Sequence, residues 1–414
     1  MYISCRVTVL VVLLVGLGNW SHAQGYMVIG GKVVDKETKQ PVAFAHVGIL
    51  SKGMGTIANE QGEFYYRFPK IASEEEVVVT HMGYKNLKKK GTEFTYGDKT
   101  IVFELERVQP VIVDSAYVNG FDARGWVGFA LSKVVENYSE TPIVMTGFYQ
   151  ETLQQNEVYV DIREATMKVE KDPRPKIEVP EKFRALRGRR FESTSRNKVL
   201  DDYEFPNGAG IVTRSLDTGL PEYLSAGISD YRFQLDDTIA FYNDKDVYRI
   251  RFQPSGPQIR GAKTGIISIN RADSAIVRIE YDFTTEGMDE VFKSSMKNVL
   301  GKVFGKNRRE AKRISSFTNY LPYDNKWFLQ DSQLLIQTDF IEKQDTITGT
   351  IRLHFVANEI LKSNGNAVPA SDQLMDTSLF PSQRIPKYDE VYWGNFNHII
   401  PSPMMRAIIE TLKR

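Results

Sequence analysis

Hydrophobic and polar positions alternate in short runs from residue 26 onward. The runs include "YMVIGGKVVD", "GEFYYRF" and "EEEVVVTHMGY", and polar turn sequences such as "DKETKQP" and "NEQG" separate them. In "GEFYYRF" the alternation places Phe64, Tyr66 and Phe68 on one face of a strand, with Tyr65 and Arg67 on the other. Short strands at close spacing predict a small antiparallel β-sandwich over residues 26–108.

A second series of strand patterns, with longer runs, occupies the region from residue 120 to 414. Hairpins are expected to turn at "QQNE", "NDKD", "NRAD" and "PYDN", and "TITGTIRLHFVANEI" is the last long strand. Antiparallel hairpins in sequence order favour a meander that forms one curved sheet. The predicted fold class is therefore mainly β: a sandwich, then an α+β domain with a curved meander sheet and a few covering helices.

Three segments have helical spacing. The stretch "DARGWVGFALSKVVENYSETP" has Asp122 as a candidate N-cap and Pro142 at its end. Residues 286–302 space apolar side chains along one face and are expected to cover the sheet. A C-terminal helix is predicted over residues 403–413, capped by Ser402. The apolar stripe of the first helix, interpreted as core-facing, consists of Val127, Ala130, Leu131, Val134, Val135 and Tyr138.

Residues 1–23 have the pattern of a secretory signal peptide rather than of a folded element. Arg6 precedes an apolar run from Val7 to Leu17, and small residues stand at the expected cleavage site after Ala23. An uncleaved N-terminal anchor is the alternative, but the apolar run is short for a membrane span. We expect export through the Sec pathway to the periplasm, the outer membrane or the exterior, and no transmembrane helix in the mature chain.

The composition of the chain argues against several classes of function. Lys and Arg number 53 against 52 for Asp and Glu, so no charge bias favours nucleic acid as a partner. Cys5, the one cysteine, lies in the predicted signal peptide. A mature chain without cysteine has no disulfide framework, no thiolate nucleophile and no Cys-ligated zinc.

The N-terminal residues carry a resemblance to a known family. The segment "GKVVDKETKQPVAFAHVGILSKGMGTIANEQGEFYYRFP", with the later "VVVTHMGYKNLKKK", resembles the carboxypeptidase regulatory-like domain. The resemblance implies a transthyretin-like, seven-stranded β-sandwich that is itself non-catalytic. Ala58-Asn59 departs from the family, which often has Thr-Asp there, and we expect a changed turn hydrogen bond.

The resemblance does not extend to a carboxypeptidase active site. Such a site needs a zinc centre built on an H-x-x-E motif and a distant histidine. His46, His81, His354 and His398 have no carboxylate or second histidine at that spacing. We interpret them as strand-face or core histidines, and we predict no metal and no cofactor.

The second region resembles the C-terminal part of secreted Gram-negative bacterial proteins that carry the same regulatory-like domain. The segments that carry this resemblance include "FYQETLQQNEVYVDIREATMKV", "FRALRGRR" and "YDEVYWGNFNHIIP". The stretch "VYRIRFQP…GIISINRADSAIVRIEY" is also similar to the curved sheet of lipoprotein-carrier folds. That similarity implies an apolar groove that holds an acyl chain.

Charged residues supply the candidate contacts. Asp161 and Glu164 are three positions apart in a predicted strand, so they point to opposite faces and are poor partners for a catalytic carboxylate pair. Two basic clusters could contact an anionic surface, with a solvated face as the alternative. The candidate contact residues are Arg184, Arg187, Arg189 and Arg190 in the first cluster, and Lys306, Arg308 and Arg309 in the second.

Three hypotheses of function follow. The first is a non-enzymatic exported envelope protein whose β-domain binds a partner or a ligand. The second is a carrier of a lipid or lipoprotein, with an amphiphilic ligand in the curved sheet. The third is a hydrolase whose site is assembled from residues distant in sequence. No catalytic residue is predicted.

Overall fold

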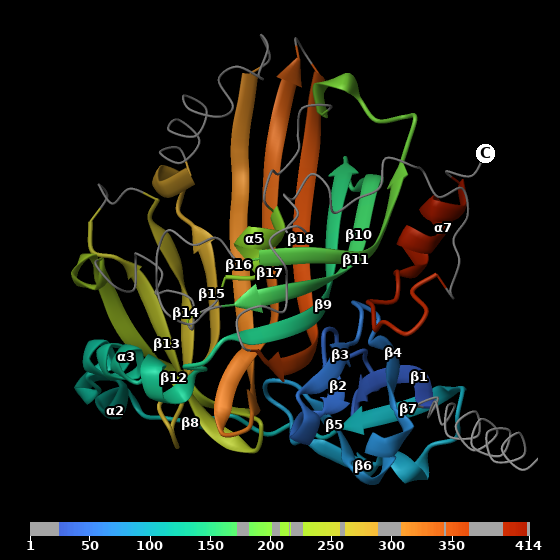
Figure 1. Ribbon diagram of the computed structural model, residues 1–414. Coiled ribbons are helices and arrows are strands. Elements are labelled where there is room, and N and C mark those ends of the chain that lie inside the picture. Colours follow the sequence, from blue (N-terminus) through green and yellow to red (C-terminus); the bar gives the residue numbers. More distant parts are fainter. Residues whose placement is uncertain are drawn as a thin grey trace, which may run out of the picture.

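A computed structural model describes residues 25–171, 182–200, 208–214, 216, 227–256, 261–288, 308–342, 345–363 and 392–411 (Figure 1). These residues form a mainly β structure with a large antiparallel sheet and a few short helices, which confirms the predicted fold class. The predicted signal peptide and most of the helix predicted over residues 286–302 lie outside the described residues.

The N-terminal part is a β-sandwich of two sheets over one apolar core. The first sheet, in spatial order, consists of β4 (Glu63–Pro69), β1 (Tyr26–Asp35) and β7 (Asp98–Leu105). The second consists of β6 (Leu87–Lys90), β5 (Glu76–Thr80), β2 (His46–Ile49) and β3 (Met54–Ile57). Short 3-10 turns, η1 (Leu50–Lys52), η2 (Lys70–Glu74) and η3 (Gly91–Glu93), connect some of these strands.

Strand β4 confirms the alternation predicted from sequence. Phe64, Tyr66 and Phe68 are buried in the sandwich core, whereas Tyr65 and Arg67 are partly exposed. The prediction that the sandwich is entirely antiparallel is wrong at one pair, because β1 and β7 run parallel. Alternation in sequence sets which face of a strand is buried, but it does not set the direction of its neighbour.

A helical connection follows β8 (Val111–Ile112). It consists of α2 (Ser115–Gly120), α3 (Ala123–Ser132) and α4 (Val134–Asn137). The Asp122 side chain accepts a hydrogen bond from the Gly125 backbone N–H at 2.9 Å, which confirms the predicted N-cap. The predicted single helix is divided at Lys133, and Val135 is exposed rather than core-facing.

The large sheet follows the predicted meander. The strands from β12 to β18 pair in sequence order, and β18 then pairs with β9. Its bounds are β9 (Ile143–Gln155), β10 (Val158–Lys171), β11 (Lys182–Glu192), β12 (Tyr231–Tyr242), β13 (Lys245–Pro254), β14 (Lys263–Asn270), β15 (Ile276–Phe283), β16 (Arg308–Tyr323), β17 (Lys326–Glu342) and β18 (Asp345–Lys362).

Three predicted hairpin turns have two central residues with positive φ. These pairs are Asn156-Glu157, Asn243-Asp244 and Asp324-Asn325. Positive φ at both positions is the type I′ geometry, whose twist matches that of the flanking strands. The turns predicted at "QQNE", "NDKD" and "PYDN" are therefore confirmed.

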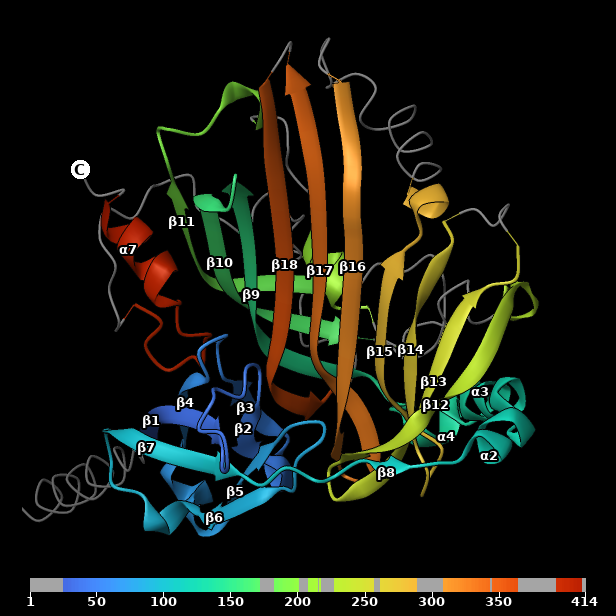
Figure 2. The same ribbon diagram turned by 180° about the vertical axis from the view of Figure 1, so that it is seen from behind.

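The sheet bends so that β9, β10 and β11 pass across one side of β16, β17 and β18 (Figures 1 and 2). We call this the concave side. Buried apolar side chains gather there from both groups of strands, including Met145, Met167, Leu353 and Phe355. The short elements η4 (Lys198–Leu200) and α5 (Gly208–Val212) pack against the same cluster. A second cluster fills the space between α3 and strands β12 to β15.

The sandwich and the large sheet form one connected structure. Glu359 of β18 pairs with Met54 of β3, so the second sheet of the sandwich continues into the large sheet. The remaining elements are η5 (Ile228–Asp230) and helix α7 (Pro403–Thr411). We call residues 392–411 the strap, because they lie against both the sandwich and the large sheet.

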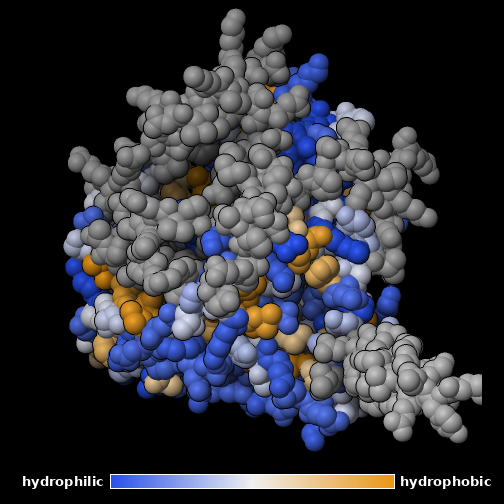
Figure 3. Space-filling model, in the orientation of Figure 1, coloured by the Kyte–Doolittle hydropathy of each residue, from blue (hydrophilic) through white to orange (hydrophobic). Residues whose placement is uncertain are grey.

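The surface seen in Figure 3 is mixed, with hydrophobic residues between hydrophilic ones. None of the helices in the described ranges is long and apolar enough to cross a membrane.

Candidate functional site

The predicted basic cluster on residues 184–190 forms part of an edge strand, β11, which pairs with β10 alone. Sequence analysis did not identify this strand. Its register with β10 places Arg189 opposite Glu164 and Arg190 opposite Arg163. Neighbouring residues of a strand point to opposite faces, so the arginines do not form one surface.

Arg189 is an interior residue. Its side chain is 1% exposed, and its Nε donates to Glu164 Oε2 at 2.6 Å; the Glu164 side chain is fully buried. The guanidinium carbon lies 4.8 Å from the ring centroid of Trp393 and 5.3 Å from that of Phe191. Aromatic faces attract a guanidinium group, so Arg189 is held in the protein and is unavailable as a surface contact.

The other predicted contacts lie in different places. Arg184 and Arg187 are exposed, and Arg187 donates to the backbone carbonyl of Tyr392 in the strap. The Arg309 guanidinium lies 4.8 Å from the Phe340 ring centroid. Lys306 and the side chain of Arg308 lie outside the described residues. An anionic-surface role thus remains a prediction for the exposed members.

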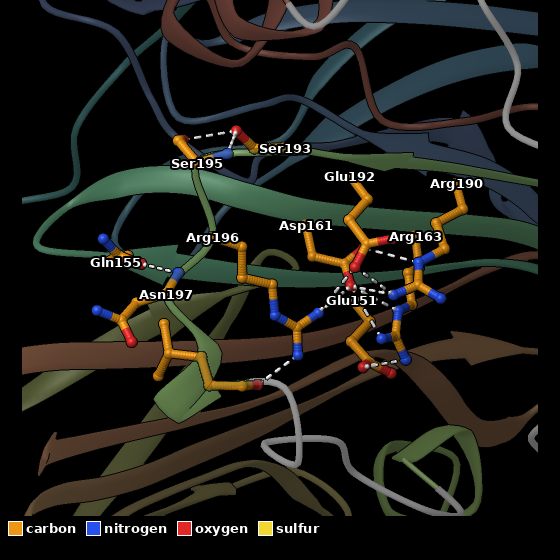
Figure 4. A network of polar contacts seen from close by, with 11 residues as sticks. Glu151, Gln155, Asp161, Arg163, Arg190, Glu192, Ser193, Ser195, Arg196 and Asn197 are labelled. Carbon is orange, nitrogen blue, oxygen red and sulfur yellow. Dashed lines mark hydrogen bonds and ion pairs between the residues drawn. The ribbon is translucent and has the colours of Figure 1, made fainter.

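Arg190 points to the concave side, where it joins a network centred on Asp161 (Figure 4). Asp161 Oδ2 accepts hydrogen bonds from Arg190 at 2.7 Å, Arg163 at 2.9 Å and Arg196 at 3.0 Å. Glu151 and Glu192 lie within 3.4 Å of these arginines and balance the charge. Asp161 is therefore the shared acceptor of the network.

The network also holds a covering segment on the sheet. Arg196 donates to the backbone carbonyl of Leu200, the last residue of η4. Leu200 is fully buried in the concave apolar cluster. The ion pairs, which Figure 4 shows, and the apolar cluster thus meet at η4, so charged and apolar side chains adjoin on the concave side.

Asp161 and Glu164 belong to separate networks, on Arg190 and Arg189 respectively, as expected for side chains on opposite faces of β10. Sequence analysis missed Arg163 and Arg196. The available signal was the spacing of "DIR" and "RFE", in which opposite charges two positions apart share one strand face.

The strap connects the sandwich to the outer, convex side of the sheet. The side chain of Asn397 accepts from the Arg67 backbone N–H at 2.7 Å and donates to the Arg67 carbonyl at 2.9 Å. Asn59 donates to the Ile400 carbonyl at 3.2 Å. Asn397 thus pairs with the edge of β4 as a neighbouring strand would.

A small cavity of about 30 Å³ lies where the sandwich, the sheet and the strap meet. It has room for one or two water molecules. His354 lines this cavity, and its Nε2 lies 3.2 Å from the buried Asp331 carboxylate, which also accepts from Asn319. The other polar side chains that line it are Asn59, Glu60, Gln150, Thr152, Tyr159, Arg352 and Ser402.

An Asp–His pair resembles part of a catalytic triad, which requires a nucleophile hydrogen-bonded to the imidazole. The hydrogen bond between His354 and Asp331 joins the neighbouring strands β18 and β17 of the large sheet. In the described part of the chain, no hydroxyl group donates to this imidazole. The same part contains no cluster of three His, Cys, Asp or Glu residues that could hold a metal ion.

Burial dominates the titration of the remaining histidines. Desolvation lowers the pKa of His46 and of His81 to about 4 each, and that of His398 to about 3. The neighbouring Asp331 raises the pKa of His46 and partly offsets the desolvation, whereas Arg189 lowers that of His398 further. The interpretation of these residues as core histidines is confirmed for His46, His354 and His398, which are buried.

Comparison with known proteins assigns a family to the sandwich alone. Residues 29–109 match the model of the CarboxypepD_reg-like domain family. No curated protein matches the chain. Among solved structures, a DUF1329 family protein from Desulfovibrio piger has 10% sequence identity and a TM-score of 0.27, with 61% of this chain and 100% of that chain covered.

Proposed function

We propose that this chain is a non-enzymatic exported envelope protein whose large curved sheet binds a ligand or partner. The match of residues 29–109 to the CarboxypepD_reg-like domain family supports a role of the sandwich as an accessory module rather than as a catalytic centre. The pattern of residues 1–23 supports export.

The observation that carries the proposal is the composition of the concave side. Apolar side chains of β9, β10, β16, β17 and β18 form one buried cluster there, against which η4 and α5 pack, and the Asp161 network lies beside η4. Binding sites for organic ligands are concave and mainly apolar, with a few fixed polar groups that set orientation. An amphiphile likewise combines an apolar part with a polar part. The ligand class that we infer is therefore an amphiphile with an apolar chain.

The second candidate is a carrier of lipids or lipoproteins, which differs from a binding protein in releasing its ligand to an acceptor. The same apolar cluster favours it, because an acyl chain requires a desolvated surface over its full length. Transfer of bound lipid to an acceptor vesicle would distinguish a carrier from a protein that retains its ligand.

Lipid mass spectrometry of the full chain, purified from its native envelope without detergent, tests both candidates. Ile347 packs against the concave cluster, and its neighbour Thr346 is exposed on the other face of β18. We expect co-purified lipid in the wild type, loss of lipid with Ile347→Glu, and retention with the matched control Thr346→Glu. A folded wild type without lipid, or equal retention by both variants, would contradict an amphiphile on the concave side.

A further inference from the structure

The four histidines in the described part of the chain all lie at the junction of the sandwich, the large sheet and the strap. His46 is in β2 and His81 follows β5, so both belong to the sandwich. His354 is in β18, opposite Gln333 of β17 and Gln150 of β9. His398 belongs to the strap. The junction therefore concentrates histidine, the residue type whose ordinary pKa of about 6.5 lies closest to neutral pH.

The sandwich histidines face charges of the large sheet. Asp331 of β17 acts on both His46 and His81, and Arg278 of β15 acts on His81. Within the sandwich, His81 also faces Arg107 and the ring of Tyr84. Among the described residues, His46 Nδ1 and His81 Nδ1 are buried and have no hydrogen-bond partner. A proton on the His46 ring would create a buried cation without a hydrogen-bond acceptor at Nδ1, whereas a backbone hydrogen bond at Met82 partly offsets the burial of His81.

His398 occupies the equivalent position between the strap, the sandwich and the sheet. Its ring centroid lies 5.4 Å from that of Tyr65 in β4 and 6.2 Å from that of Phe148 in β9. The charge that faces it is the buried Arg189 of β11. Protonation of His398 would therefore place two cations near each other in a desolvated site, which is unfavourable.

We propose that this junction is acid-labile: protonation of His46, His81 and His398 releases the sandwich and the strap from the large sheet while the separate cores remain folded. The clusters that hold each part together consist of apolar side chains, and their stability does not require a neutral histidine. His354 differs from the other three in its contacts, because its Nε2 is hydrogen-bonded to the carboxylate of Asp331 within the large sheet.

The lowered pKa values of these histidines set the direction in which docking depends on pH. A released histidine regains a pKa near 6.5, whereas the docked side chains have pKa values of about 4, 4 and 3. At pH values between the docked and the released pKa, the released state therefore binds more protons than the docked state. Docking is fully favoured above pH 6.5 and weakens as the pH falls from there toward 4.

Hydrogen exchange of the full chain, measured by mass spectrometry at a series of pH values and corrected for intrinsic exchange rates, tests the proposal. We expect peptides from β2, β4 and the strap to lose protection at a higher pH than peptides from β13 to β17. Loss of protection in all regions at the same pH would overturn the proposal.

Release of the junction should take up about three protons in the wild type, and a variant with His46, His81 and His398 all replaced by Gln should lack the separate acid transition. If that variant does not fold, His398→Gln alone should lower the uptake by about one. His354→Gln is the matched control and should leave the junction's acid transition in place. An unchanged transition in a folded triple or single variant would also overturn the proposal.

Discussion

Arg189 and Glu164 form a salt bridge of 2.6 Å in which neither side chain is more than 1% exposed. Gln150 donates a further hydrogen bond to Glu164 at 2.8 Å, and Trp393 of the strap covers the guanidinium. The pair joins two strands of the sheet to the strap. The folded state tolerates these buried charges only when both partners are present, because a single buried charge is strongly unfavourable.

Replacement of Arg189 by Met should destabilise the protein by about 3–5 kcal/mol, because Glu164 would remain as an uncompensated buried charge. Urea denaturation followed by circular dichroism measures the change. Arg184→Met, on the exposed part of the same strand, is the control, and it should cost less than about 1 kcal/mol. Equal effects of the two substitutions would show that the buried pair has no special role.

Replacement of Asp161 by Asn should also destabilise the protein by several kcal/mol. The Asp161 carboxylate accepts hydrogen bonds from three arginine side chains. The amide of asparagine has the same shape but carries no negative charge. Glu192→Gln removes a carboxylate of the same network at a position with 26% exposure, and its cost should be less than about 1 kcal/mol. Thermal unfolding of the two variants under identical salt conditions compares them.

Replacement of Asn397 by Ala should loosen the strap. The substitution leaves the backbone N–H and C=O of Arg67 without their partners and should cost about 1–3 kcal/mol. Limited proteolysis should cut the strap faster in this variant than in the wild type. Asn395, which is exposed in the same segment, provides the control Asn395→Ala. Equal cleavage of the two variants would contradict the pairing role of Asn397.

Replacement of Glu157 by Gly should stabilise the protein by about 1 kcal/mol. Glu157 has φ of +69° in the turn between β9 and β10, where an L-residue is strained and glycine is not. Glu157→Ala removes the same charge without relieving the strain, so its midpoint in urea should stay near that of the wild type. A gain of equal size with Ala would assign the effect to charge.

Sequence patterns predicted the local features well and the long-range ones poorly. The alternation of Phe64, Tyr66 and Phe68 is a property of one strand, and the Asn156-Glu157 turn is a property of one hairpin, so both can be inferred from neighbouring residues. The parallel pairing of β1 with β7 and the pairing of β9 with β18 depend on distant segments, and no local pattern encodes them.

Contacts between distant segments also explain why the members of the basic cluster on residues 184–190 differ in burial. Arg184, Arg187, Arg189 and Arg190 look equivalent in sequence, and their difference arises from strand β11 and from the strap. Arg189 is buried because Glu164 and Trp393 meet there, although they are far from it in the chain. A charge run in an edge strand can thus contain one interior ion pair among exposed side chains, which composition alone does not reveal.

The position of β18 has a consequence for the order of folding. This strand pairs with β17 and β9 and also contacts β3 of the sandwich, so three parts of the chain converge on it. The pairing with β9 closes a very long loop, and contacts of such sequence separation form late and slowly. The pairing of β9 with β18 therefore cannot form until the intervening strands β10 to β17 and β18 itself have been synthesised. Until then the concave apolar cluster lacks the side chains that β18 contributes, so the apolar side chains of β9 and β10 have no partner from that strand.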